Sequence, residues 1–206
     1  PQEVIKEFGA DVLRLWVSAC NYNEDIRISK EVLSRTAESY RKIRNTLKFI
    51  LGNLHDFNPE EDTIAYSDML EIDKWALYVT ENLLKEITSG YENFEFHKVT
   101  HLMYNFCVLE MSNVYLDIIK DRLYIFPKAS IERRSCQSAL FRILDVMIKV
   151  LSPIFPFTME EVFAHINKKS ESESVHTQPW PVPNSAFLEY PHKEKWDRLF
   201  KIRALV

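Results

Sequence analysis

The sequence predicts an all-α fold, an antiparallel bundle of long helices, and three observations support this prediction. Prolines are far apart, with none between Pro1 and Pro59, between Pro59 and Pro127, or between Pro127 and Pro153. These spans leave room for long helices, because proline breaks a helix interior. Apolar residues recur within the spans at helical spacing, and no set of segments shows the strict alternation of half-buried strands.

The composition is that of a folded protein. Of the 206 residues, 46% are hydrophobic and 27% are charged, which excludes disorder of the whole chain, and the length allows one or two domains with a real core. No apolar run is long enough to cross a bilayer and no secretory signal opens the chain, so we expect a cytoplasmic protein without a membrane partner. Cys20, Cys107 and Cys136 are far apart, which indicates free thiols and argues against a cysteine zinc site.

The first half of the chain is expected to begin with a short helix, a break at Gly9, a second helix and a loop. Ser29 is the predicted N-cap of a long helix over about residues 30–55, because a serine hydroxyl can accept a hydrogen bond from a free N–H group at a helix start. An acidic connection then leads to a helix over about residues 69–90, and Gly90 is predicted to stop it.

The second half contains the longest helical pattern, over residues 94–126, followed by a helix over residues 130–152. Thr158 with Glu161 three residues later predicts a capping box at the start of the next helix. A loop and a last helix from near Lys193 complete the order. The predicted core residues are Trp16, Leu47, Leu51, Trp75, Phe106, Leu109, Leu140 and Leu144.

Positive charge is concentrated on one predicted helix. The net charge is −4, but between residues 30 and 55 six Lys or Arg face two Glu, a balance of +4 that leaves −8 for the rest. At about 100° per residue, Arg41, Arg44, Asn45 and Lys48 share one arc, here named the cationic stripe, beside an apolar arc. The stripe is either a solvated face that balances acidic neighbours or a surface that follows phosphates, with Asn45 bonding a base edge.

Other polar groups give no evidence of catalysis. His97 and His101 have the spacing of a helical metal pair, but no third ligand is evident, so structural or surface roles are favoured. Glu60, Glu61 and Asp62 fall in a polar loop and are interpreted as solvated charges, since a catalytic pair needs a cleft that separates its pKa values. There is no Gly-rich phosphate loop, Ser-centred elbow or recognisable Cys-His pair. We therefore expect no catalytic residue, metal or cofactor within this segment.

Several stretches, in order, resemble the class I aminoacyl-tRNA synthetases. "GADVLRLWVS" followed by "EDIRIS" resembles the exit from their catalytic domain, and "YRKIRNTLKFILGNLHDF" resembles the first long helix of their helical anticodon-binding domain. "YNFCVLEMSNVYLDIIKDRLY", "LSPIFPFTMEEVF" and "SVHTQPWP" continue in the expected order. "EDIRIS", "LGNLHDF" and "KDRLY" favour the bacterial isoleucine branch over the valine and leucine branches. The resemblance covers nearly the whole chain.

The resemblance implies an excised anticodon-binding domain. Residues 1–28 would be the connection that follows the catalytic domain, residues 29–166 the helical anticodon-binding bundle, and residues 167–206 a loop and the truncated start of the C-terminal junction. The parent enzyme would use ATP with Mg²⁺ to join isoleucine to its tRNA, and it would carry a zinc site outside this segment. The implied partners are the tRNA(Ile) anticodon stem-loop and the parent's catalytic and editing domains. A monomer is expected.

With the resemblance, the cationic stripe is predicted to face the anticodon stem-loop, and Trp180 is interpreted as a packed loop anchor more readily than as a stacking platform. Two other classes of function remain. A helical protein-interaction module would show an exposed apolar groove and binding that is insensitive to salt. A four-helix metalloenzyme would need inward Glu and Glu-x-x-His ligands on several helices, a set that "EFHKVTH" does not supply.

Overall fold

The computed structural model describes residues 1–26, 28–166 and 173–203, and every regular element in these ranges is a helix. The all-α prediction is confirmed. The long segments are α3 (Lys30–Asn53), α4 (Glu71–Glu92), α5 (Phe96–Asn105) continued by η2 (Phe106–Tyr115), and α8 (Ile131–Leu151). The shorter ones are α1 (Gln2–Phe8), α2 (Ala10–Ala19), η1 (Tyr66–Asp68), α6 (Leu116–Ile118), α7 (Lys120–Tyr124), α9 (Pro156–Ile166), η3 (Val175–Thr177), α10 (Ser185–Leu188) and α11 (Lys193–Arg203). Residues 167–172 of the predicted loop lie outside the described residues.

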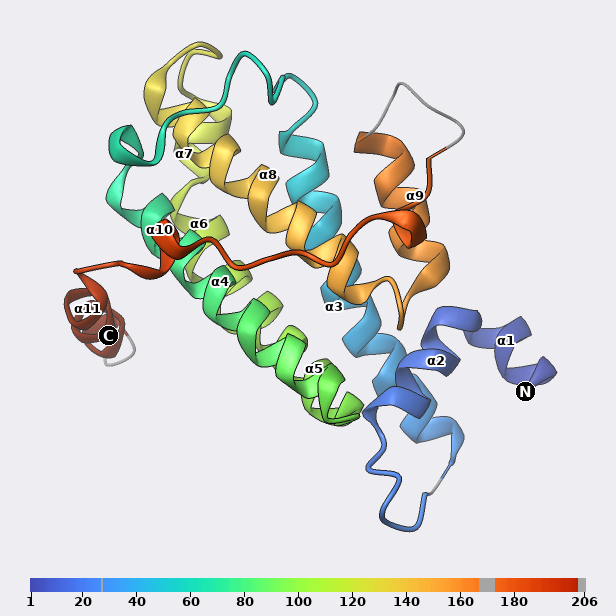
Figure 1. Cartoon of the computed structure of the whole chain (residues 1–206). Coiled ribbons are helices and arrows are strands. Elements are labelled where there is room, and N and C mark those ends of the chain that lie inside the picture. Colours follow the sequence, from blue (N-terminus) through green and yellow to red (C-terminus); the bar gives the residue numbers. More distant parts are fainter. Residues whose placement is uncertain (27, 167–172, 204–206) are drawn as a thin grey trace.

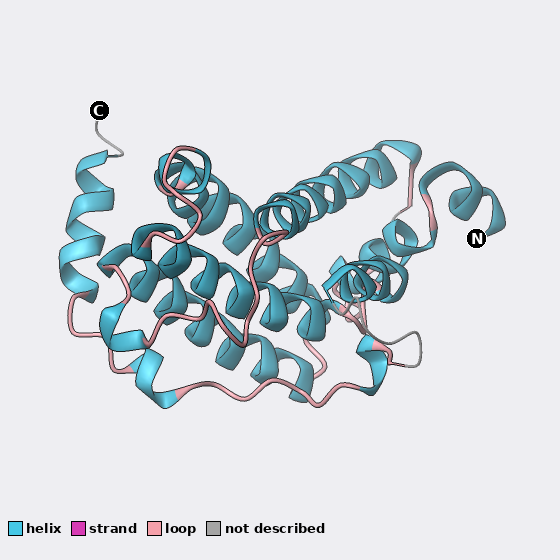
Figure 2. Cartoon of the chain, turned by 90° about the horizontal axis from the view of Figure 1, so that it is seen from above, coloured by secondary structure: helices cyan, strands magenta, loops and turns pink. Residues whose placement is uncertain are grey.

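Successive long segments run in alternating directions along the bundle (Figure 1). α4 packs beside α8 and α5, whereas α3 packs beside η2 and α8. The N-terminal helices α1 and α2 lie at one end of the molecule and α11 lies at the other (Figure 2). In Figure 1, α3 lies behind α8, and the extended segment 178–184 crosses in front of α4 and α8. One face of the bundle is thus covered by this segment, and α3 lies on the opposite face. The division of the chain at residues 28 and 166 stays a prediction.

The start of α3 follows from local chemistry. The Ser29 hydroxyl accepts a hydrogen bond from the backbone N–H of Val32 at 3.2 Å, which confirms the predicted N-cap. The helix ends at Asn53, slightly before the predicted end at His55, within the usual uncertainty of helix ends. The α3 residues that are buried in the bundle are Leu33, Ile43, Thr46, Leu47 and Ile50.

The single long helix predicted over residues 94–126 is wrong in its middle. The backbone from Phe106 to Tyr115 is a π-helix, whose wider turns change which residues face inward. Phe106 and Met111 are buried there, whereas Leu109 is 52% exposed. The prediction that Leu109 belongs to the core is therefore wrong, because it assumes α-helical spacing that this backbone does not keep.

The other predicted core residues, except Trp16, lie inside the core or pack against it. Leu47, Trp75, Phe106, Leu140 and Leu144 are buried. Trp16 and Leu51 are only half-buried, and Leu51 packs against the core from its margin. Helical spacing thus identifies buried positions in α3, α4 and α8, but it overstates the burial of Trp16 in α2 and fails for Leu109 in the π-helix.

Two predicted helix-end signals have other roles. Gly90 does not stop α4, because the helix continues to Glu92 and Gly90 is buried within it. A Cβ at Gly90 would lie 2.8 Å from the Val99 side chain, so the glycine allows α5 to approach α4 closely. Thr158 does not cap α9, which begins at Pro156. Instead, the buried Thr158 hydroxyl donates to the Asp11 carboxylate at 2.5 Å and joins α9 to α2.

A buried ionic cluster connects α4 with η2, α7 and α8. Both oxygens of the fully buried Asp73 carboxylate accept hydrogen bonds from the Arg122 guanidinium, at 2.9 and 2.6 Å. The hydroxyls of Tyr115 and Ser135 donate to the same carboxylate at 2.8 and 2.6 Å. Burial, together with the Asp73 charge, raises the pKa of Tyr115, so its hydroxyl stays protonated and remains a donor.

A second ionic cluster fastens the end of α3 to α8. The Asp56 carboxylate accepts from Arg133 Nη2 at 3.1 and 3.0 Å and from Gln137 Nε2 at 2.8 Å. Gln137 also donates to the backbone carbonyl of Asn53. Burial of Asp56 opposes its ionisation, but the hydrogen bonds from Gln137 and Arg133 outweigh burial and lower the pKa of Asp56.

This lowered pKa predicts a pH-dependent stability. Because the folded-state pKa of Asp56 lies below its unfolded value of about 3.9, ionised Asp56 stabilises the fold above that pH, and the stabilisation is lost as the pH falls through the folded-state pKa. Urea unfolding of the wild type and of Asp56→Asn should therefore show a free-energy difference at pH 6 that shrinks towards pH 3. A difference that is the same at both pH values would contradict this assignment.

Candidate nucleic-acid interface

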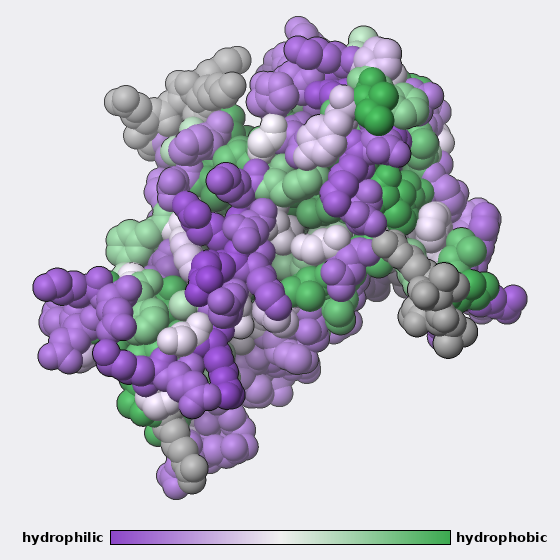
Figure 3. Space-filling view, turned by 180° about the vertical axis from the view of Figure 1, so that it is seen from behind, coloured by the Kyte–Doolittle hydropathy of each residue, from purple (hydrophilic) through white to green (hydrophobic). Residues whose placement is uncertain are grey.

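The cationic stripe lies on the outer face of α3. Arg41, Arg44, Asn45 and Lys48 are all exposed, and the buried residues of α3 lie on the other side of the helix. Figure 3 views the molecule from behind, the side on which α3 lies, and shows a band of hydrophilic residues crossing this face. The predicted positions are therefore brought together on one open surface.

Three of the four stripe residues have no partner within the part of the chain that the structure describes. No hydrogen bond or ion pair holds the side chains of Arg44, Asn45 or Lys48 there. Arg41 Nη1 lies 3.0 Å from Glu38 Oε1, but both side chains are largely in solvent, where such a pair contributes little. The stripe thus presents cationic and amide groups that an external ligand can bind without breaking a buried contact.

Most other arginines are held by partners within the fold. Buried or half-buried pairs join Arg122 to Asp73, Arg133 to Asp56 and Arg142 to Glu81. Arg14 donates to the backbone carbonyls of residues 153 and 154. Among the arginines whose side chains are described, Arg44 alone has neither an ion pair nor a hydrogen bond. The contrast indicates that the buried and half-buried arginines stabilise the fold, whereas the charge of the exposed Arg44 is not compensated by any described side chain.

Lys42 is a flanking cation that the sequence interpretation did not place in the stripe. Its Nζ donates to the Tyr104 hydroxyl at 2.9 Å and lies 5.4 Å from the centre of the Tyr104 ring. The hydrogen bond to Tyr104 is the main cause that raises the pKa of Lys42, so the ammonium stays charged at neutral pH. At 100° per residue Lys42 falls outside the arc of the stripe. Its contact with Tyr104 of α5 shows that it lies on the side of the stripe that faces α5.

The elements beside α3 hold it in a fixed position. At its N-terminal half, the Tyr40 hydroxyl lies 2.7 Å from the Thr158 hydroxyl of α9. At its C-terminal end, Asp56 and Asn53 are bound by α8, as described above. These contacts fix α3 on both sides of the cationic stripe and keep the spacing of its exposed side chains, which suits recognition of a ligand with a regular backbone.

The remaining sequence candidates lie away from the stripe or have other partners. His101 Nε2 lies 3.0 Å from Asn105 Nδ2. Within the described ranges, no group of three or more His, Cys, Asp or Glu side chains is arranged for a metal ion. Trp180 Nε1 donates to Thr88 Oγ1 at 3.0 Å, and its ring meets Tyr91 edge-on at 5.2 Å. These contacts agree with the interpretation of Trp180 as a loop anchor.

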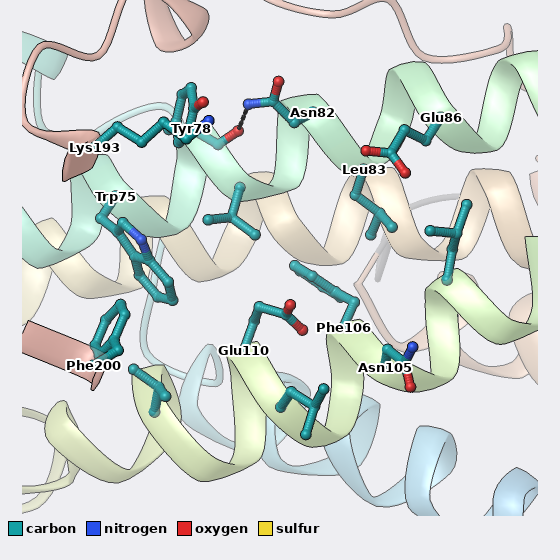
Figure 4. Close-up of a pocket in the computed structure, with 14 residues that line it drawn as sticks. Trp75, Tyr78, Asn82, Leu83, Glu86, Asn105, Phe106, Glu110, Lys193 and Phe200 are labelled. Atoms are coloured by element: carbon teal, nitrogen blue, oxygen red, sulfur yellow. Dashed lines mark hydrogen bonds between the residues drawn. The ribbon is translucent and has the colours of Figure 1, made fainter. Parts of the chain in front are cut away.

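A groove of about 610 Å³ lies between α4 and the α5–η2 rod, with α11 at one end (Figure 4). Trp75 and Phe200 line this end, and Glu86 and Glu110 lie along the groove. Burial raises the pKa of Glu110. Its lining is mainly apolar and carries two carboxyl groups, Glu86 and Glu110, against one ammonium group, Lys193, so it does not suit an RNA backbone. It is the kind of feature that a protein-interaction module would use.

Comparison with known proteins decides the family. Residues 73–206 match the family described as "Anticodon-binding domain of tRNA ligase". The chain belongs to this family. The matched range begins at Asp73, after α3, so the match itself does not assign a role to the cationic stripe.

Bacterial relatives are similar over the whole chain. It is 47% identical over 203 residues to "Isoleucine--tRNA ligase" of Petrotoga mobilis, covering 98% of this chain and 22% of the relative. It is 46% identical over 206 residues to the protein of the same name from Carboxydothermus hydrogenoformans, covering 100% of this chain and 22% of the relative. The chain therefore spans about a fifth of the length of these curated relatives.

A solved structure supports the fold. The chain resembles LeuRS of Agrobacterium radiobacter K84, seen in a ternary complex with tRNA and LeuAMS, with a TM-score of 0.68 and 18% sequence identity over 92% of this chain and 21% of that one. At this identity the likeness shows the helical architecture alone. No helix in the described part of the chain has the length and apolar character needed to cross a membrane.

Proposed function

We propose that this chain is the anticodon-binding part of an isoleucine–tRNA ligase and that it binds the anticodon stem-loop of tRNA(Ile) through the cationic stripe on α3. The observation that carries the proposal is the exposed set Arg44, Asn45 and Lys48, which has no partner among the described residues and lies on a part of α3 that is fixed on both sides. Family membership and the isoleucine relatives support the identity of the RNA.

Each stripe residue has a role that follows from its chemistry. Arg44 and Lys48 hold phosphates of the stem-loop, and Arg41 joins them when it exchanges the exposed Glu38 for a phosphate. Asn45 carries both a donor and an acceptor, which suits hydrogen bonding to the edge of an unpaired base. Phosphate contacts fix the position of the RNA, and the contact of Asn45 adds sequence preference.

The chemistry of the parent protein is assigned to its other regions. The parent joins isoleucine to tRNA(Ile) with ATP and Mg²⁺, and its zinc site lies outside this segment, so the segment alone is expected to be inactive. This domain contributes tRNA binding, acts with the catalytic and editing domains, and works in a cytoplasmic monomer. An alternative is the valine or leucine branch, which a preference for the corresponding anticodon would reveal.

Salt dependence of RNA binding tests the stripe. Each phosphate contact contributes about −0.7 to the slope of log affinity against log salt, or about −2 for three contacts. The triple variant Arg41→Gln, Arg44→Gln, Lys48→Gln should flatten the slope by about 2 and weaken binding of any stem-loop alike. For the isolated chain we expect a Kd of about 10⁻⁴–10⁻⁶ M, since the rest of the chain is acidic.

Two further variants separate specific contacts from net charge. Asn45→Ala should cost about 1–3 kcal/mol on the isoleucine stem-loop, almost nothing on a loop with changed anticodon bases, and leave the slope intact. The control Lys6→Gln, Lys85→Gln, Lys195→Gln removes the same charge from other exposed positions and should change the slope little. If both triple variants behave alike, the stripe is not the RNA surface.

The groove beside α4 supports one second candidate, a protein-docking function without RNA binding. It predicts that the stem-loop binds weakly and that neither Asn45→Ala nor the stripe variant alters this binding. The same titrations therefore decide between the two candidates.

A further inference from the structure

The C-terminal end of the cationic stripe leads to an exposed aromatic corner. Phe49 follows Asn45 by one helical turn on α3, and its ring meets the ring of Tyr124 on α7 at 6.5 Å, with an angle of 79° between them. Tyr124 is 63% exposed, and its neighbour Ile125 is 75% exposed. An edge-to-face contact orients the Tyr124 ring while most of the ring stays open to solvent.

An exposed aromatic corner beside a cationic helix suits a single-stranded nucleic acid as its ligand. Single-stranded nucleic acids bind where basic side chains follow the backbone and aromatic rings stack on unpaired bases. Arg41, Asn45 and Phe49 are four residues apart, so they form one ridge on α3 that ends at Tyr124. The corner therefore lies where the first unpaired bases would arrive if the stripe holds the backbone.

Gly52 provides an independent observation. It lies in the last turn of α3, it is exposed, and it follows Asn45 by seven residues, so it continues the arc of the stripe. Its φ is not positive, and a Cβ added there would meet no described atom within 4 Å. Neither the backbone conformation nor packing against the described residues requires a glycine, although glycine weakens a helix relative to alanine. A ligand that approaches the backbone closely at this point would explain why the residue is a glycine.

We propose that Tyr124, oriented by Phe49, is a stacking platform for an unpaired base of the anticodon loop, and that Gly52 leaves room for the RNA beside it. This inference rests on the proposed function, because it requires that the stripe binds the stem. It adds a base-binding position on a different helix, α7, where Tyr124 ends the motif "KDRLY", to which the sequence analysis assigns no role in binding.

The test measures affinity of the 206-residue chain for an RNA stem-loop with an isoleucine anticodon, by fluorescence anisotropy. Loss of one stacked base corresponds to a roughly 5- to 150-fold lower affinity, which we expect for Tyr124→Ala, whereas Tyr124→Phe keeps the ring and should bind as the wild type does. Phe94→Ala is the matched control, because Phe94 is also 63% exposed and meets Phe96 edge-on at 6.2 Å.

Abasic substitutions in the loop identify the base. At one loop position, removing the base should weaken binding of the wild type and abolish the difference between wild type and Tyr124→Ala. The salt slope should stay unchanged in Tyr124→Ala, because no phosphate contact is lost. An affinity of Tyr124→Ala equal to that of the wild type, or an equal loss with every abasic loop, overturns the platform. Loss of binding in the stripe variant alone would then leave the proposed function standing.

Gly52→Ala tests the close approach separately. Alanine should raise the melting temperature by about 2 °C, since it is the better helix former, and should lower RNA affinity at least several-fold because its methyl group occupies the space of the ligand. A more stable variant with unchanged affinity would show that no ligand approaches Gly52.

Discussion

Replacing Asp73 with alanine is expected to destabilise the chain by about 3–5 kcal/mol, because it leaves the buried guanidinium of Arg122 without its counter-charge. Asp73 is fully buried, and its carboxylate accepts hydrogen bonds from Arg122, Tyr115 and Ser135. All three donors lose their acceptor at once. Urea unfolding of the wild type and the variant measures the change directly.

Two controls show whether the loss comes from the buried cluster. Glu31→Ala removes an exposed ion pair with Arg35 and should cost less than about 1 kcal/mol. The double variant Asp73→Ala, Arg122→Ala should lose less than the sum of its single variants, since the two side chains interact. A loss at Asp73 no larger than that at Glu31 would mean that the cluster does not hold α4 to α7 and α8.

Replacing Phe106 with alanine is expected to cost about 3–5 kcal/mol, the range for truncating a buried aromatic side chain. Phe106 is 2% exposed at the start of the π-helix, whereas Leu109 in the same segment is 52% exposed. Leu109→Ala should therefore cost less than about 1 kcal/mol.

The pair of variants tests the register of η2 as well as the burial of one ring. In an α-helix, residues three apart share a face, so both truncations would be costly. A loss at Leu109 as large as that at Phe106 would show that the segment is α-helical in solution. A small loss at both positions would mean that this face of the rod does not reach the core.

The π-helix shows where sequence reasoning about the fold ends. Helical spacing identifies the inward faces of α3, α4 and α8, because each keeps a regular turn over many residues. In η2 the wider turn places Tyr115 against Asp73, a residue 42 positions earlier in the chain. The Ser112 hydroxyl also donates to the carbonyl of Cys107, five residues back. A local sequence pattern does not contain the long-range contact between Tyr115 and Asp73.

For the candidate site too, the sequence predicts which side chains are exposed but not which tertiary contacts they make. The exposure of Arg41, Arg44, Asn45 and Lys48 follows from helix geometry and is observed, but their role in RNA binding stays a prediction. Which arginines remain free depends on tertiary partners. Arg133, for example, reaches Asp56 across 77 residues of sequence. The Phe49–Tyr124 contact likewise joins two helices whose proximity the sequence does not reveal.

Chemical footprinting of lysines tests most directly whether α3 is the RNA surface, because it uses the unmodified sequence. Lys48 on the stripe and Lys85 on α4 are both exposed and have no partner among the described residues, so Lys85 serves as the internal reference. The rate of acetylation of each lysine is measured by mass spectrometry with and without saturating isoleucine anticodon stem-loop. We expect the RNA to slow acetylation of Lys48 and to leave Lys85 unchanged. Equal rates at Lys48 with and without bound RNA would contradict the assignment of the cationic stripe as the anticodon-binding surface.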